Sequence, residues 1–387
     1  MIVTVVCDVL GKENNGTTIA AMNLIRSLKA KGYEVRVVCP DKEYAGKESF
    51  YVVPTLNLGP INGYIEKNGV SLAKVDKKIM FDAINGADVV HVMLPFSLGR
   101  AAVKICGQLN IPVTAGFHAQ AENVSAHLKM RNFEPVNRIY YKSRWKKVYQ
   151  YVDCIHYPTE FIRNVFEQNI RSATEGRVIS NGVNKAFIAD KPIMHERNGK
   201  FKIICTGRYS AEKRQSILID AVALSKHKDD INVVFAGAGP LKEKLISRSE
   251  KKGINASFKF FGRDELIEEL HTADLYVHTA EIEIEAIACL EAIASGLVPV
   301  IANSPKSATK AYALCDDNLF DYDSAASLAE KIDFWYEHPE RVDGCLSMYS
   351  DFTKEIDYDV CMDKMENMLL DVVERHTGRS LKKKSIA

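Results

Sequence analysis

Short apolar runs alternate with amphipathic segments along the first half of the chain. The runs that we interpret as buried strands are Met1–Cys7, Glu34–Cys39, Asp88–Met93 and Pro112–Ala115. Continuous apolar runs of this length are typical of parallel sheets, whose strands are covered on both faces. Between the first two runs, Thr17–Lys31 carries apolar residues at helical spacing and is followed by Gly32, a residue type that often ends a helix. The repeated order of strand, helix and strand predicts a doubly wound α/β domain.

The second half of the chain starts the same alternation again. Its predicted strands are Phe201–Cys205, Asn232–Ala236, Phe258–Phe261, Leu275–His278 and Val298–Ala302, separated by helical patterns such as Ser216–Ser225 and Leu241–Lys252. We therefore expect an α/β protein with two Rossmann-like lobes and a cleft between them. The expected domains are residues 1–183 and 184–350, with a linker within Asn184–Lys200 and a helical tail, residues 351–387, that packs back toward the first domain.

Composition narrows the class of protein. A chain of 387 residues is long enough for two domains that each bury a core. The formal net charge of +1 indicates no nucleic-acid partner, so any anion must be bound locally. The nine cysteines form no Cys-x-x-Cys pair, which favours buried free thiols in a reducing cytoplasm over a zinc or redox site. The sequence shows neither a signal peptide nor an uncharged apolar window of about 18 residues, so we expect neither secretion nor a transmembrane helix.

Candidate ligand-binding residues follow the first two strands of the second half. Gly207 comes after one strand, and the cations Arg208 and Lys213 follow at the sheet edge where open α/β sheets bind ligands. Arginine offers a planar fork to phosphate oxygens, and lysine offers a point charge. Gly237 and Gly239 follow the next strand and would let a phosphate or a nucleoside approach the backbone. Taken singly, each segment also has a structural explanation. Arg208 and Lys213 could be solvated charges before a helix, and Gly237 and Gly239 could form a plain turn between a strand and a helix.

A third segment combines two glutamates with an apolar helix. The predicted start of the helix comprises Glu285, Ala286 and Ile287. Free N–H groups and the positive end of the helix dipole suit a diphosphate there. Glu283, before the helix, could hold sugar hydroxyls, and Glu291, within it, could hold a ribose diol. The alternative is a capping carboxylate and a partly exposed glutamate, but the apolar neighbours of Glu291 argue against it.

Together the three segments resemble the family-four retaining glycosyltransferases of GT-B fold. The signature of that family has two glutamates with seven residues between them, which Glu283 and Glu291 match. Arg208 and Lys213 match its G-R-x-x-x-x-K, whose side chains carry the pyrophosphate of the donor. The resemblance implies that Arg208, Lys213 and Glu283 are catalytic. The implied donor-binding residues are Gly16, Gly207, Gly237, Gly239, Arg263, Glu285, Ala286, Ile287 and Glu291. Glu285-Ala286 replaces the usual Phe-Gly, which leaves the identity of the donor sugar open.

The first half contains two features that resemble the reaction centre of the family. Gly16 lies in the loop Gly11–Thr18, and such a loop covers the anomeric side of the donor in the family. His118 follows a predicted strand, resembles the catalytic histidine, and could bond the donor sugar and help to seat the acceptor hydroxyl. The candidate acceptor contacts are Gln120, Glu122 and Asn123, which could equally serve loop structure. We interpret His91 as a structural residue at a strand end.

Basic and aromatic residues are mixed over residues 137–151. Helices of this kind can lie on anionic membrane surfaces, although an ordinary amphipathic helix with a solvated basic face fits the pattern equally well. With the segment around His118, this stretch is similar to membrane-associated bacterial glycosyltransferases that glycosylate diacylglycerol or phosphatidylinositol. The similarity implies peripheral association with the cytoplasmic face of a membrane.

The resemblance as a whole implies a retaining hexosyltransferase. It would move a sugar from a nucleoside-diphosphate sugar, with UDP favoured, to a hydroxyl acceptor such as diacylglycerol. Two basic side chains can replace a bound cation, so we expect no required metal or other cofactor. The open alternatives are a soluble sugar or polysaccharide precursor as acceptor, a GT-B sugar-nucleotide epimerase, and a nucleotide-sugar-binding protein without catalysis.

Overall fold

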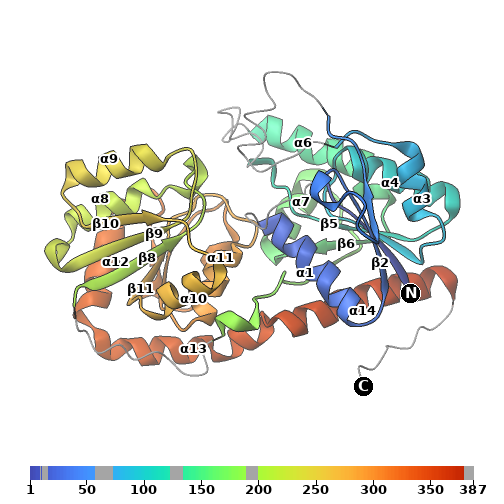
Figure 1. Cartoon of the computed structure of the whole chain (residues 1–387). Coiled ribbons are helices and arrows are strands. Elements are labelled where there is room, and N and C mark those ends of the chain that lie inside the picture. The colour runs from blue at the N-terminus through green and yellow to red at the C-terminus, as the bar shows by residue number, and fades with distance from the viewer. Residues whose placement is uncertain (9, 11–15, 57–72, 123–133, 189–198, 379–387) are drawn as a thin grey trace. The chain divides into compact units, whose positions relative to one another are not determined.

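The structure of the protein is a computed structural model, shown in Figure 1. It describes residues 1–8, 10, 16–56, 73–122, 134–188 and 199–378. The chain divides into two compact units, Met1–Asn181 with the residues from Cys361 onward, and Gly182–Val360. Each unit contains its own parallel sheet, so the α/β class with two Rossmann-like lobes and a helical C-terminal region is confirmed.

The first unit is built on a seven-stranded sheet in the order β3-β2-β1-β4-β5-β6-β7, in which every pair is parallel. The strands are β1 (Ile2–Val6), β2 (Glu34–Cys39), β3 (Phe50–Val52), β4 (Val89–Val92), β5 (Val113–Gly116), β6 (Cys154–Tyr157) and β7 (Gly176–Val178). The strand order reverses between β1 and β4. At such a switch point the connections leave in opposite directions, which makes room for a ligand at the carboxyl ends of the strands.

Amphipathic helices connect these strands. They are α1 (Gly16–Ala30), α3 (Lys77–Ile84), α4 (Ser97–Leu109), α6 (Glu134–Lys147) and α7 (Glu160–Ile170). The apolar face of α1 is buried through Leu24, Ile25 and Leu28. Thr159 caps α7, because its hydroxyl accepts a hydrogen bond from the amide of Ile162 at 3.4 Å.

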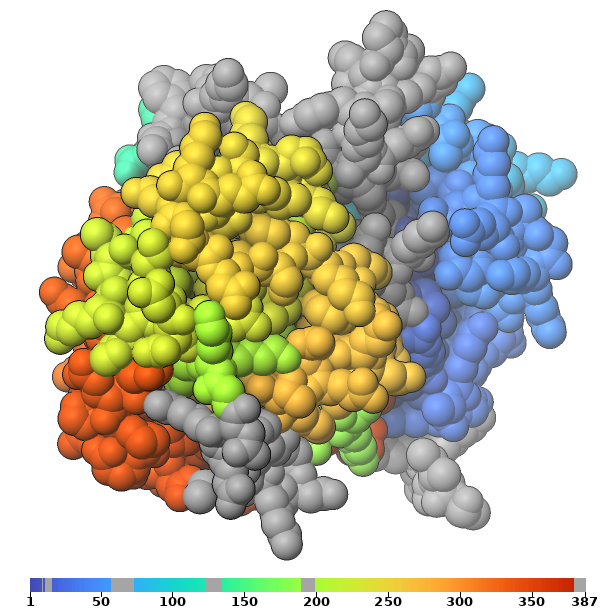
Figure 2. Space-filling view, turned by 60° about the vertical axis from the view of Figure 1, so that its left-hand side comes forward, coloured from blue at the N-terminus to red at the C-terminus, as the bar shows by residue number. Residues whose placement is uncertain are grey.

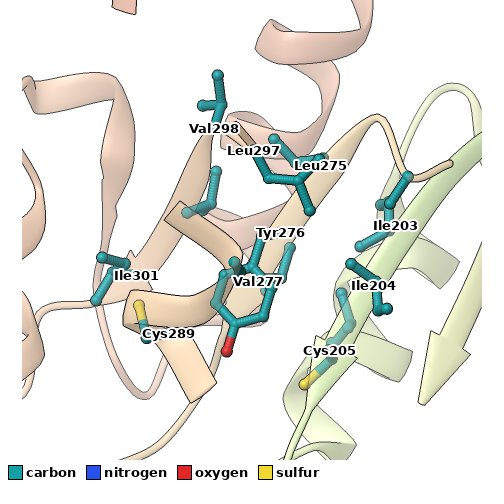
Figure 3. Packing of buried hydrophobic residues seen from close by; sticks show 14 of the residues in the cluster. Ile203, Ile204, Cys205, Leu275, Tyr276, Val277, Cys289, Leu297, Val298 and Ile301 are labelled. Atoms are coloured by element: carbon teal, nitrogen blue, oxygen red, sulfur yellow. The ribbon is translucent and has the colours of Figure 1, made fainter. Parts of the chain in front are cut away.

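The second unit has a six-stranded parallel sheet in the order β10-β9-β8-β11-β12-β13. Its strands are β8 (Phe201–Thr206), β9 (Ile231–Ala236), β10 (Ala256–Lys259), β11 (Leu275–His278), β12 (Pro299–Ala302) and β13 (Leu319–Phe320). Figure 3 shows part of its core, where Ile203 and Ile204 of β8 belong to one buried cluster with Tyr276 of β11. The order reverses between β8 and β11, which places a second switch point there.

The helices of the second unit are α8 (Ser216–Leu224), α9 (Lys242–Lys252), α10 (Arg263–His271), α11 (Ile287–Ala294), α12 (Ala325–Glu337) and α13 (Val342–Glu355). α8 and α11 are the most apolar and are buried on most sides. α9 buries only Leu245 and Ser249, and it is visible as a yellow ridge on the surface in Figure 2. The sequence pattern therefore decides which helices are central to the unit and which cover it.

The last helix, α14 (Tyr358–Thr377), starts in the second unit, and most of its length belongs to the first. Within the first unit, Glu366 of α14 accepts hydrogen bonds from Lys31 at 2.6 Å and from the hydroxyl of Tyr33 at 2.5 Å. α13 crosses the predicted boundary at residue 350, and residues 189–198 of the predicted linker lie outside the described residues.

The predicted strands agree closely with the structure. Glu34–Cys39 and Leu275–His278 have the predicted bounds, whereas the strand predicted at Phe258–Phe261 occurs two residues earlier. The strands β3, β6, β7 and β13 were not predicted. β3, β7 and β13 contain only two or three residues each, which is too few for a period of two to be recognised.

Candidate active site

The candidate donor site lies at the switch point of the second sheet. The segments that follow β8 and β11 are joined there by hydrogen bonds. The amide of Glu281 donates to the carbonyl of Glu212 at 2.8 Å. The hydroxyl of Thr279 donates to the backbone carbonyl of Lys213 at 2.6 Å. This pairing brings predicted residues from two separate motifs, Lys213 and Glu283, into contact.

Lys213 and Glu283 form a largely buried ion pair. The side chain of Glu283 is 11% exposed and that of Lys213 is 23% exposed. His278 Nε2 lies 3.2 Å from the same carboxylate oxygen, without the alignment of a hydrogen bond. Burial alone would raise the pKa of Glu283, but the charge of Lys213 and the contact with His278 outweigh burial and hold the pKa at about 2. Glu283 is therefore an anion at neutral pH.

Hydrogen bonds from the core fix the orientation of His278. The hydroxyl of Tyr276, visible in Figure 3, lies 3.1 Å from His278 Nδ1 and 2.9 Å from the hydroxyl of Thr206. Tyr276 is fully buried, so its hydroxyl cannot turn toward water. The Nδ1 contact leaves Nε2 of His278 facing Glu283.

Gly237 and Gly239 pack directly on the backbone that follows β8. A β-carbon at Gly237 would lie 2.0 Å from the carbonyl oxygen of Gly207, and one at Gly239 would lie 2.5 Å from that of Tyr209. The amide of Tyr209 also donates to Ala238 at 3.0 Å. The immediate reason for the two glycines is thus contact between loops. Their part in donor binding stays a prediction.

Gly207 turns the chain at the end of β8. Its φ of 134° lies outside the range that other residues adopt easily. Arg208 follows and is half-buried, and its carbonyl accepts a hydrogen bond from Gln215 Nε2 at 2.7 Å. This bond closes the loop that contains both predicted cations, Arg208 and Lys213.

The start of α11 has an unusual backbone. Ala286 precedes the helix with φ 63° and ψ 67°, in the left-handed region that glycine prefers. This is the position at which the resembled family has glycine. The hydroxyl of Tyr312 donates to the carbonyl of Glu285 at 2.7 Å, and the side chain of Glu285 is buried. The predicted helix start is therefore present, with α11 beginning at Ile287. The amide of Cys289 donates to the carbonyl of Ala286 at 2.8 Å, so only the amides before Cys289 are left without partners inside the helix.

Glu291 lies on α11 in a partly buried position. Burial raises its pKa to about 7, against the opposing charge of Arg263 at the start of α10. The sequence predicted both residues as donor contacts, and the structure brings their charges within reach of each other. A carboxyl group with a pKa near 7 carries a proton for part of the time at neutral pH.

Sequence reasoning missed a second cluster of charges beside the predicted one. Glu281 is buried, and its carboxylate lies 3.3 Å from Lys306 Nζ and 3.9 Å from Arg214. The signal in the sequence is the alternation of Glu281, Glu283 and Glu285 with isoleucine, an unusual run of acidic residues directly after a buried strand.

The remaining predicted residues belong to the first unit. Gly16 is the exposed first residue of α1, and Asn123 lies outside the described residues. Gln120 is buried, and Glu122 accepts a hydrogen bond from the hydroxyl of Tyr141 at 2.7 Å. His118 follows β5, and its Nε2 is buried.

The basic stretch forms α6 and the turn after it. One of its cations is structural, because Arg144 stacks on Phe96 and Tyr140 and donates to the carbonyl of Pro95 at 3.1 Å. The exposed side chains include the lysines Lys142, Lys146 and Lys147 and the apolar Ile139. Among the helices in the described part of the chain, none is both long enough and apolar enough to cross a bilayer.

Comparisons with known proteins agree with this architecture. Residues 14–187 match the family described as Glycosyltransferase Family 4, and residues 187–346 match the one described as Glycosyl transferases group 1. Two curated relatives carry the name alpha-monoglucosyldiacylglycerol synthase. The one from Acholeplasma laidlawii is 24% identical over 95% of this chain and 96% of its own length. The one from Streptococcus pneumoniae is 26% identical over 56% of this chain, and the match spans only 52% of that relative.

A solved structure shows the same fold over nearly the whole chain. Anabaena Alr3699/HepE in complex with UDP-glucose superposes with a TM-score of 0.74 at 15% identity, and the match covers 95% of this chain and 99% of that one. The two family matches together span residues 14–346, which include both sheets. The chain therefore belongs to the glycosyltransferases of GT-B fold, with a family 4 domain followed by a group 1 domain.

Proposed function

We propose that the protein is a retaining hexosyltransferase that transfers a sugar from a nucleoside diphosphate, with UDP favoured, to the hydroxyl of a membrane lipid such as diacylglycerol. The observation that carries this proposal is the buried pair of Lys213 and Glu283 at the switch point of the second sheet. An ammonium group beside an ionised carboxylate suits a substrate that presents a phosphate next to sugar hydroxyls.

In the proposed reaction, the bond between the anomeric carbon and the diphosphate oxygen breaks, and a bond to the acceptor oxygen forms. The acceptor proton passes to the departing diphosphate. Negative charge grows on that diphosphate, and Arg208, Lys213 and the first amides of α11 stabilise it from fixed positions. Attack from the face that the diphosphate leaves retains the anomeric configuration. Because these groups neutralise the leaving group, we propose that no divalent cation is required.

The lipid acceptor is supported by two observations. Two of the curated relatives are named alpha-monoglucosyldiacylglycerol synthase. In addition, α6 presents exposed lysines and the apolar Ile139, which is 67% exposed, on the surface of the first unit. Lysines attract anionic headgroups, and an exposed apolar side chain can enter the interface. We propose that α6 places the protein on the membrane that supplies the acceptor.

The test combines donors and acceptors. The purified protein is incubated with UDP-glucose, UDP-galactose or GDP-mannose, together with vesicles that contain diacylglycerol or with soluble sugars. We expect the nucleotide to be released only when vesicles with diacylglycerol are present, and EDTA should not change the rate. NMR of the product should show an α-linked glycolipid. Transfer to soluble sugars alone would exclude the lipid acceptor. Epimerised donor without any acceptor would indicate an isomerase instead.

Matched variants assign the site. Lys213→Ala and Glu283→Gln should each lower kcat by about 100-fold or more, since each removes charge stabilisation of the transition state. Lys251→Ala, which removes an exposed lysine at the end of α9, should leave kcat unchanged. If kcat is the same in all three variants, the ion pair takes no part in the reaction.

A further inference from the structure

Three histidines from neighbouring strands of the first sheet lie close together. His91 is on β4, His118 follows β5, and His156 is on β6. The rings of His118 and His156 are 5.5 Å apart at 69°, and those of His91 and His156 are 6.4 Å apart. Each ring has one buried nitrogen without a hydrogen-bond partner among the described residues. Three unpartnered nitrogens in one place are unusual, because an unmade buried hydrogen bond costs stability.

His156 has a defined tautomer. Its Nε2 lies 2.7 Å from the carbonyl oxygen of Ile179, and a carbonyl only accepts. Nε2 of His156 must therefore carry the hydrogen. In a neutral imidazole, the other nitrogen then has a lone pair, and this Nδ1 is the buried atom that lacks a partner. Burial lowers the pKa of His156 to about 4, so the neutral form prevails at pH 7.

His91 presents a second nitrogen to the same region. Its Nδ1 lies 2.8 Å from the hydroxyl of Thr114, which leaves Nε2 unpartnered. Burial, and to a smaller extent the nearby His156, lowers the pKa of His91 to about 3, so this ring is also neutral. The strands β4, β5 and β6 therefore bring two neutral imidazoles close to His118.

Gly116 provides the space that His118 occupies. A β-carbon at this position would lie 2.5 Å from His118 Nε2 and 3.6 Å from His91 Nε2. Nε2 of both rings therefore borders the same small volume beside the backbone of Gly116. The carbonyl of Gly116 is held in turn by the hydroxyl of Tyr149 at 3.2 Å. A residue larger than glycine at this position would displace the His118 ring.

We propose that His91 and His156 are positioning residues that hold His118 with its hydrogen on Nε2, directed inward, so that Nδ1 stays a lone-pair acceptor for a substrate hydroxyl. Of the two neutral tautomers of His118, the Nε2–H form places a hydrogen near the lone pairs of His156 and His91, whereas the Nδ1–H form would place a third lone pair there. The described residues contain no group of three or more ligands placed to share a metal ion. No hydrogen bond joins the three unpartnered nitrogens, so His91 and His156 act on His118 through the lone pairs that they present to its ring. This inference rests on the proposed function, in which His118 contacts a sugar or acceptor hydroxyl.

The tautomer is tested without any substrate. Protein labelled with 15N in its histidine rings gives tautomer-specific long-range proton–nitrogen correlations, and the spectrum of His118→Asn assigns the signals of His118. We expect the Nε2–H form of His118 in the wild-type protein at pH 7. A dominant Nδ1–H form, or a protonated ring, would overturn the proposal whatever the enzyme acts on.

The positioning role is tested with two substitutions of one residue. His156→Gln keeps an amide donor for Ile179 and an acceptor for His118, whereas His156→Phe keeps only the size of the ring. The assay uses the donor and acceptor that the transfer test identifies. We expect His156→Phe to lower kcat by about tenfold or more at unchanged donor KM. The kcat of His156→Gln should stay within about threefold of wild type. A purely structural role predicts the opposite order, with phenylalanine tolerated better than glutamine.

The controls separate this inference from the proposed function. His271→Phe removes another ring with a buried unpartnered nitrogen, on α10, and should leave kcat unchanged. His91→Phe repeats the test if His156→Phe does not fold, with the same expected fall in kcat. If the wild-type protein transfers no sugar at all, the proposed function fails while the NMR measurement still decides the tautomer.

Discussion

At the residue scale, the candidate donor site is governed by charges that are paired before any substrate arrives. Lys213 and Glu283 share a largely buried position, and the His278 ring completes their surroundings. Removing one partner of such a pair leaves a charge in a medium that solvates it poorly. The pair therefore contributes to stability as well as to the proposed chemistry, and the two contributions can be measured separately.

We expect Lys213→Met to lower the free energy of unfolding by about 3 kcal/mol at pH 7, because it leaves the Glu283 carboxylate buried and unpaired. The double variant Lys213→Met/Glu283→Gln should recover most of this loss, since no charge is then buried. Urea unfolding of the two variants and the wild type measures both effects. A double variant as unstable as the single one would show that packing, not charge, holds the site.

The same pair predicts a dependence on acid. The pKa of Glu283 is about 2 in the folded protein and about 4.5 when unfolded, so its contribution is complete above pH 4.5 and is lost as the pH falls toward 2. The stability advantage of wild type over Glu283→Gln should shrink by about 2 kcal/mol between pH 6 and pH 3. Urea titrations at these two pH values supply the comparison, and a constant difference would contradict the ion pair.

Glu291 predicts the opposite pH dependence. Its pKa is raised to about 7 by burial, so the folded protein binds a proton that the unfolded chain releases above about pH 4.5. Wild type thus loses stability as the pH rises from 4.5 to 7. Relative to wild type, Glu291→Gln should gain about 2 kcal/mol between pH 5 and pH 8. Glu268→Gln, at an exposed position on α10, is the control that should show no such gain.

At the scale of elements, the start of α11 combines the proposed binding of a diphosphate with backbone strain. Ala286 adopts the left-handed conformation at φ 63°, which costs about 1–2 kcal/mol for residues other than glycine. The conformation turns the chain so that the helix begins at Ile287, directly after the segment that contains Glu283 and Glu285. The element is therefore placed by the turn that precedes it and not by a side-chain cap.

Substitutions at Ala286 test this strain. Ala286→Gly should leave stability unchanged or raise it by up to about 1 kcal/mol, because relief of strain is offset by the entropy of glycine in the unfolded chain. Ala286→Val should lower stability by more than about 1 kcal/mol, since a branched side chain crowds the left-handed backbone. Thermal unfolding and calorimetric titration with UDP report stability and donor binding. Equal tolerance of glycine and valine would argue against a strained turn.

At the scale of the whole molecule, α14 returns the end of the chain to the first unit. Glu366 on this helix is 4% exposed and binds both Lys31 and Tyr33, residues that are more than 300 positions away in the sequence. Asp363 contacts the same lysine from a position that is 56% exposed. The two carboxylates therefore share a partner but differ in burial.

This difference predicts the effect of their removal. Glu366→Ala should destabilise the first unit by about 2 kcal/mol, because it removes the buried carboxylate that accepts from both Lys31 and the hydroxyl of Tyr33. Asp363→Ala should cost less than about 0.5 kcal/mol, as is usual for exposed ion pairs. Hydrogen exchange of the amides in β2 and α14 locates the change, and chemical unfolding gives its size. Similar losses in both variants would contradict the role assigned to burial.

The sequence by itself determined the two parallel-sheet lobes, because continuous apolar runs and helical spacing express burial directly in residue order. It also placed Arg208, Lys213, Glu283 and the start of α11 in one family signature, since these groups lie within a few residues of strand and helix ends. Only the tertiary structure decided which groups touch: the Lys213–Glu283 pair, Glu281 with Lys306, and the three histidines from β4, β5 and β6. The order of strands in a sheet brings distant residues together, and local hydrophobic patterns carry no information on that order.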